Sequence, residues 1–160
     1  MTKKLQPSHY AKAKYGVTTP VDFDVAVNYS SALLAIAGAD GELADSELAW
    51  YINEQRLLLN DSDEYVEAIR NIDWRNVNIE ERLSNLRYDF PVNFRHGMLY
   101  DAITMCSADG EYHVKEKAAV KKAAETLGVA PDVVTNLEAL VKMEAAAHEL
   151  RCSLVGTVSS

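Results

Sequence analysis

The stretch "GADGELADSE", residues 38–47, returns 69 positions further along the chain as "SADGEYHVKE", residues 107–116. Each copy places an Asp directly before a Gly, and a Glu follows seven positions after that Asp. Apolar residues with helical spacing precede both turns, so that Leu34 corresponds to Ile103. The sequence therefore predicts an internal duplication of one unit, which consists of a helix, an acidic turn and a second helix.

Outside the repeat, the hydrophobic periodicity is also helical. Apolar residues recur with a period of about 3.6 from residue 22 onward. The one segment that competes as a strand, "YDFPVNF", is interrupted by Pro91, which suits the first turn of a helix. We expect an all-α fold, a single-domain bundle of about seven helices with the internal duplication. The predicted helices cover residues 22–38, 46–59, 61–72, 78–88, 91–107, 114–127 and 131–150.

The two ends of the chain differ in composition from this helical body. Residues 1–20 are rich in Lys, Ser, Thr and Pro and are predicted to form an N-terminal arm. Residues 21–151 form the predicted helical domain, and residues 152–160 a flexible tail. The first residues contain lysines but no apolar run, so they do not resemble a signal peptide. We expect a cytoplasmic protein that is not an integral membrane protein.

The charge balance narrows the class of partner. The 160 residues contain 16 Lys and Arg against 24 Asp and Glu, a net charge of −8. Binding to nucleic acid needs a basic surface, so nucleic acid is not an expected partner. The negative net charge favours cations or basic proteins as partners. The two cysteines, Cys106 and Cys152, are isolated and form no CxxC motif.

The acids of the two turns are the candidate functional residues. Asp40 and Asp109 each follow a helix, where the helix dipole disfavours a negative charge, so something must offset that cost. Glu47 and Glu116 fall in the first turn of the next helix, but Ala44 and His113 are poor N-cap residues.

Two interpretations of these four acids stay open. In one, they only satisfy the ends of helices. In the other, Asp40, Glu47, Asp109 and Glu116 bind a divalent metal ion, with Ca²⁺ or Mg²⁺ favoured by an all-oxygen ligand set. His113 lies close enough in sequence to add a nitrogen ligand and admit Zn²⁺. The spacing is not that of an EF-hand, in which Gly is sixth and Glu twelfth.

The paired "ADGE…E" turns, each after an apolar helix ("ALLAIAGADGELADSE" and "LYDAITMCSADGEYHVKE"), resemble the tellurite-resistance TerB-like family. The same fold is similar to the N-terminal domain of membrane-anchored DnaJ-type co-chaperones. The resemblance covers about residues 22–145 and implies an all-α fold, a metal-binding cluster of acids and a role in tellurite and chemical-stress resistance. It also implies protein partners, such as a membrane-associated stress-resistance complex. Ala44 and His113 depart from the small polar or acidic residues that the family often has there.

No motif for catalysis is present, since GxSxG, Walker, HExxH and glycine-rich dinucleotide sequences are all missing. We expect a non-enzymatic protein with a divalent-cation site. The alternative is a metal-free adaptor that docks proteins through charged faces, because residues 40–67 hold nine acids and residues 70–95 hold five Arg. Trp50 and Trp74 would then be aromatic anchors. Cys106 is expected to be a buried, inert thiol.

Overall fold

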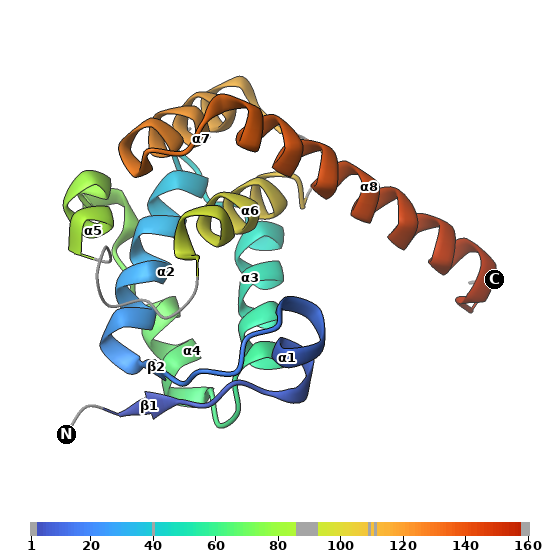
Figure 1. The fold of residues 1–160 in the computed structure, drawn as a ribbon, viewed down its shortest axis with the longest axis horizontal. Coiled ribbons are helices and arrows are strands. Elements are labelled where there is room, and N and C mark those ends of the chain that lie inside the picture. Colours follow the sequence, from blue (N-terminus) through green and yellow to red (C-terminus); the bar gives the residue numbers. More distant parts are fainter. Residues whose placement is uncertain (1–2, 40, 86–92, 109, 111, 158–160) are drawn as a thin grey trace.

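A computed structural model describes residues 3–39, 41–85, 93–108, 110 and 112–157. This part of the chain is almost entirely helical, as predicted (Figure 1). Eight α-helices are found in it, together with one short 3-10 helix and two very short strands. In chain order these are β1 (Lys4–Leu5), α1 (His9–Tyr15), β2 (Val21–Asp22), α2 (Phe23–Ala37), α3 (Asp45–Leu58), α4 (Asp63–Arg70), η1 (Trp74–Asn76), α5 (Ile79–Asn85), α6 (Phe94–Cys106), α7 (Val114–Leu127) and α8 (Pro131–Val155).

The hydrophobic core is built around α2 and α6, the first helices of the two repeated units. These two helices pack against each other, and the second helix of each unit also packs on the first helix of the other unit. Thus α3 contacts α6, and α7 contacts α2. Such reciprocal packing is expected of two copies related by an approximate two-fold axis. It brings the N-terminal ends of α3 and α7 to the same side of the central pair.

The N-terminal segment is more structured than a loose arm. β1 and β2 pair as antiparallel strands, and α1 lies between them in sequence. Leu5 and Ala11 are only 1% and 2% exposed, so the segment contributes to the core. The Ser8 N–H also donates to the Leu58 carbonyl, which ties the segment to the end of α3. Residues 1–20 were predicted without this helix because α1 is short and its packing is long-range.

Several helix ends follow the predicted local chemistry. Gly128 ends α7 with φ 72°, a left-handed conformation that glycine adopts without a Cβ clash. Pro131 occupies the first turn of α8. That helix continues to Val155, beyond the predicted boundary at residue 151, and its last turns project from the body (Figure 1). Pro91, which was predicted to lie in the first turn of a helix, is outside the described residues. The helix of that region, α6, begins at Phe94.

None of the described helices combines the length and the hydropathy that a bilayer-spanning segment requires. Most of the helices instead have a buried and an exposed face, whereas the second half of α2, residues 29–37, is buried on all sides.

Candidate metal centre

The glycines of the two acidic turns have similar backbone geometry. Gly41 has φ 98° and Gly110 has φ 88°, a region that side chains with a Cβ rarely adopt. Each glycine N–H donates to the carbonyl three residues earlier, that of Gly38 or Ser107, at 3.0 Å. The predicted left-handed glycines are therefore present, although both lie beyond the helix ends rather than at the first position after them. The predicted ligands Asp40 and Asp109 lie outside the described residues.

Glu47 and Glu116 occupy equivalent places in the first turns of α3 and α7. The Ala44 N–H donates to Oε1 of Glu47 at 3.1 Å, and the His113 N–H donates to Oε1 of Glu116 at 3.2 Å. These bonds form half of a capping box, in which a Glu satisfies the N–H of the N-cap residue. One oxygen of each carboxylate therefore serves the helix terminus, as the structural interpretation of the sequence required.

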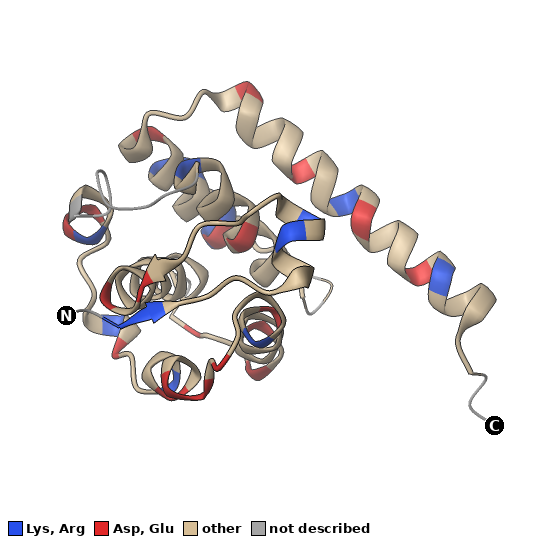
Figure 2. Ribbon diagram, turned by 60° about the horizontal axis from the view of Figure 1, so that its bottom comes forward, with Lys and Arg blue, Asp and Glu red and all other residues tan. Residues whose placement is uncertain are grey.

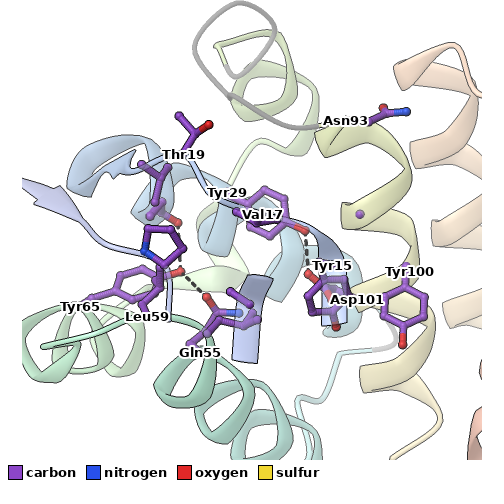
Figure 3. A pocket seen from close by; sticks show the side chains of 16 residues that line it. Tyr15, Val17, Thr19, Tyr29, Gln55, Leu59, Tyr65, Asn93, Tyr100 and Asp101 are labelled. Atoms are coloured by element: carbon purple, nitrogen blue, oxygen red, sulfur yellow. Dashed lines mark hydrogen bonds between the residues drawn. The ribbon is translucent and has the colours of Figure 1, made fainter. Parts of the chain in front are cut away.

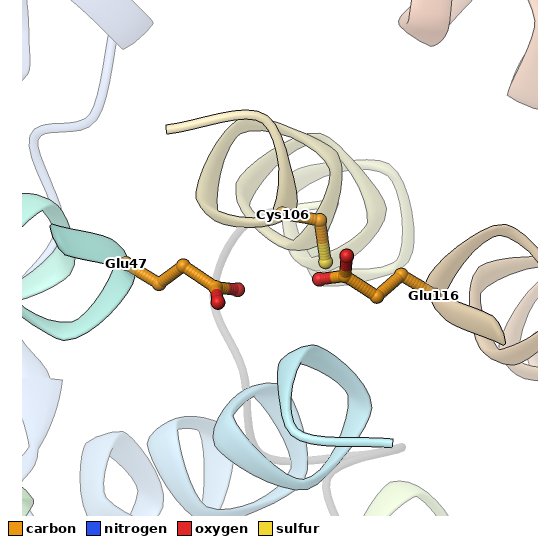
Figure 4. Close-up of side chains that lie close together, drawn as sticks. All are labelled: Glu47, Cys106 and Glu116. Atoms are coloured by element: carbon orange, nitrogen blue, oxygen red, sulfur yellow. The ribbon is translucent and has the colours of Figure 1, made fainter. Parts of the chain in front are cut away.

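The packing of the two units brings these two glutamates together. Glu47 reaches inward from α3 and Glu116 from α7, and the thiol of Cys106 at the end of α6 lies beside them (Figure 4). One possible ligand atom from each of the three residues lies within 4.8 Å of the other two. Glu47, Cys106 and Glu116 are 5%, 1% and 1% exposed. Three groups that can ligate a metal therefore meet in the interior of the protein.

Burial makes this arrangement costly unless it is compensated. Removing an ionised carboxylate from water costs several kcal/mol, by order of magnitude, and two close carboxylates also repel. The positive ends of the α3 and α7 dipoles and the two backbone N–H donors offset part of that cost. However, Oε2 of Glu116 is buried and accepts no hydrogen bond from the described part of the chain. A cation between the side chains would supply the missing interaction.

The donor set fits a divalent transition metal. Two carboxylates and a thiol combine hard and soft ligands, which suits Zn²⁺ better than Ca²⁺ or Mg²⁺. Tetrahedral Zn²⁺, with bonds of about 2.0–2.3 Å, holds its ligand atoms about 3.5 Å apart. The three ligand atoms of the protein all lie within 4.8 Å of one another, so the side chains would move closer together to bind the ion.

Of the other candidates from the sequence, His113 is exposed and is not part of the cluster. Cys106 was expected to be an inert thiol, and its place in the cluster was not predicted. The sequence feature that could have indicated it is the repeat, in which Cys106 corresponds to Ala37 of the first copy. His148 and Cys152 do share one face of α8, with Nε2 and Sγ 3.6 Å apart, but both are exposed.

Comparison with known proteins agrees with the fold. No protein-family model and no curated protein matches the sequence. A solved structure does match: a crystal structure of a tellurite resistance protein from Nostoc punctiforme, at 26% sequence identity and a TM-score of 0.74. The match covers 92% of this chain and 91% of the other. The resemblance predicted from the acidic turns is therefore confirmed: along nearly its whole length, this chain is similar to a tellurite resistance protein of the TerB-like type.

Proposed function

We propose that the chain acts in tellurite or general chemical-stress resistance as a non-enzymatic protein that binds a divalent metal ion between its two repeated units. The observation that carries this proposal is the meeting of Glu47, Cys106 and Glu116 in the interior. The similarity to a tellurite resistance protein supports the biological setting.

The metal would act as a structural link. Glu47 belongs to the first repeated unit, whereas Cys106 and Glu116 belong to the second. A single ion bound to these residues would join the two units and stabilise the two-fold arrangement, because binding to the folded state alone adds to stability. Tellurite itself is an oxyanion and is a poor ligand for a cluster of carboxylates.

The metal-free adaptor receives less support from the described residues. Trp50 and Trp74 are half-buried and pack against the hydrophobic core rather than standing out as anchors. Arg82 donates to Oδ1 of Asn28 at 2.8 Å, so one arginine of the predicted basic face is held within the protein.

Thermal unfolding with and without metal tests the proposal. We expect Zn²⁺ at about 100 times its Kd to stabilise the chelator-treated protein by about 2.7 kcal/mol, which is several degrees in Tm. Glu116→Gln should abolish the shift because it removes a ligand charge. Glu125→Gln is the matched control, an exposed acid on the same helix, and should retain it.

Further variants identify the ligands. Cys106→Ala should weaken the binding of Zn²⁺ more than the binding of Mn²⁺, because the thiol is the soft ligand. The double variant Asp40→Asn, Asp109→Asn tests whether the two turn aspartates also contribute. If the native protein melts at the same temperature with Zn²⁺, Mn²⁺, Ca²⁺, Mg²⁺ and chelator, the metal proposal is wrong and a metal-free role is favoured.

A further inference from the structure

Another acid, the half-buried Asp101, lies in a different part of the molecule, at a cavity of about 310 Å³. The N-terminal segment forms one wall of the cavity, and residues of α2, α3, α4 and α6 line the rest (Figure 3). The wall is mainly apolar. Asp101 belongs to α6 and retains some accessible surface because it faces this space.

Tyrosines surround the acid. The hydroxyl of Tyr29 donates to Oδ2 of Asp101 at 2.7 Å. Tyr15 and Tyr100 also line the cavity, with their rings in an edge-to-face contact at 6.2 Å, and so does Tyr65. A carboxylate among aromatic rings is the chemistry that recognises organic ammonium groups, through charge pairing and cation–π contacts.

A lysine of the protein, Lys14, lies close to Asp101 but does not line the cavity. The Lys14 ammonium lies 5.1 Å from the centre of the Tyr15 ring and pairs with Glu54 at 3.0 Å. Glu54 therefore has a cation partner, whereas no ion pair of Asp101 with a Lys or Arg is found among the described residues.

We propose that this cavity binds a small organic cation, an ammonium group carried on an apolar body, with Asp101 as its counter-ion. The volume lies at the lower end of the range for ligand sites, which is about 300–1,000 Å³, so the ligand is small. The apolar wall contacts the body of the ligand, and the tyrosine rings and Asp101 contact its charged group. The negative net charge of the protein favours a cation as well.

Calorimetric titration with benzylammonium, and with the neutral benzyl alcohol as a comparison, tests the proposal. Native protein should bind benzylammonium at least tenfold more tightly than benzyl alcohol. Asp101→Asn retains an acceptor for Tyr29 and should remove this preference. Gly97→Leu, which places a side chain in the cavity, should weaken the binding of both probes. Circular dichroism establishes that each variant is folded.

The pH dependence supplies an independent readout. Burial raises the pKa of Asp101 to about 7, and the nearby Glu54 carboxylate adds to this effect, whereas Tyr29 and Lys14 oppose it. Benzylammonium should therefore bind more tightly at pH 8 than at pH 6, and this difference should vanish in Asp101→Asn. Equal binding of the two probes, or no binding of benzylammonium at pH 8, would overturn the proposal.

A second, independent feature is an exposed apolar stripe on α8. Leu140, Met143, Leu150 and Leu154 are between 39% and 75% exposed, and Ala147 is exposed between them. Their spacing alternates between three and four residues, which is the a and d pattern of a coiled coil. A different face of the same helix, with Leu137 and Val141, packs on the body.

The charges beside the stripe indicate how a second copy fits. Along the outer half of α8, two basic residues, Lys142 and Arg151, enclose two acidic ones, Glu144 and Glu149 (Figure 2). If two α8 helices cross antiparallel at Ala147, Leu140 of each copy meets Leu154 of the other. Glu144 of each then lies beside Arg151 of the other, so both flanking pairs have opposite charges. A parallel pair has no such match.

We infer that two copies of this chain associate through antiparallel α8 helices. The stripe spans 15 residues, or about 21 Å, so the contact is small and the dimer is expected to be weak, in the micromolar range. Sedimentation at rising concentration should detect it. Leu150→Asp should give a monomer, whereas Ala145→Asp, off the stripe, should not.

A charge exchange tests the antiparallel orientation. Glu144→Arg alone and Arg151→Glu alone should each weaken the dimer, and the double variant should restore it, because both pairs are then reversed together. A protein that stays monomeric at several hundred micromolar overturns the inference. A dimer that Leu150→Asp leaves intact also overturns it. If the double variant does not restore the dimer, the antiparallel register centred on Ala147 is wrong.

Discussion

The first repeated unit, α2 with α3, and the second, α6 with α7, share a turn glycine and a buried glutamate but have different neighbours. Both contain a positive-φ glycine and a buried glutamate that accepts the N–H of the N-cap residue. Around this shared frame, Gly38 corresponds to Ser107, Ala37 to Cys106 and Ala32 to Asp101.

The shared features are those that the local backbone requires, since a left-handed turn needs glycine and a helix start benefits from an acid. The differing residues face other parts of the protein. Trp74 covers Gly38, Cys106 joins the two glutamates, and Asp101 faces the cavity under the N-terminal segment. The two copies therefore differ in the residues that contact other parts of the protein and not in the residues that shape the turn.

The largest expected effect comes from Asp101, whose counterpart is an alanine. Because burial raises its pKa from 3.8 to about 7, the folded state holds this proton between about pH 4 and pH 7 while the unfolded state releases it. The free energy of unfolding should therefore fall as pH rises through this window, by about 2–4 kcal/mol. Asp101→Asn should remove this loss and be more stable than the native protein at pH 8. Urea unfolding of the native protein and of Asp101→Asn at pH 4.5 and pH 8 measures this effect. If the two proteins differ in free energy of unfolding by the same amount at both pH values, Asp101 is not the group that titrates.

Gly38 gives the next largest effect. A Cβ at this position would collide with the ring of Trp74, whereas Ser107 in the other copy carries a side chain. Gly38→Ser should cost about 1–3 kcal/mol, the usual penalty for overpacking. The matched exchange, Ser107→Gly, should cost less. If Gly38→Ser unfolds at the same denaturant concentration as the native protein, the ring moves freely and this difference between the copies is not steric.

The two glutamates should behave alike in the absence of metal. Glu47→Ala and Glu116→Ala each remove an acceptor for an N-cap N–H and leave a small void, which should cost about 1–2 kcal/mol in chelator. Glu116→Gln retains the acceptor and should cost less. Denaturant titration of all three checks this. A much larger cost for one copy would show that the two caps are not equivalent.

The smallest expected effect is at Gly97, in the interior of α6. A Cβ there would meet only the Tyr29 hydroxyl, at 3.8 Å, which is ordinary contact. Gly97→Ala should therefore stabilise the protein by about 0.5–1 kcal/mol through helix propensity. Thermal unfolding measures the gain. A loss of stability would indicate that the cavity beside Tyr29 requires the glycine.

Local sequence patterns predicted much of this molecule. The 3.6-residue period identified every helix from α2 to α8, because the apolar residues that pack on neighbouring helices recur at this spacing. The acidic turns identified Glu47 and Glu116, together with Asp40 and Asp109, as candidate metal ligands. The same reasoning missed α1, which is short and depends on its contact with α3, and it placed the end of α8 too early.

By itself, the sequence determined the helical class, the duplication and the two turns, since these depend on residues close together in the chain. Only the tertiary structure decided that Glu47 and Glu116 meet, because this requires α3 to pack on α6 and α7 on α2. The same is true of Cys106 beside them and of Asp101 under the N-terminal segment. These contacts join residues far apart in sequence, and their geometry depends on how whole helices cross, which no local pattern encodes.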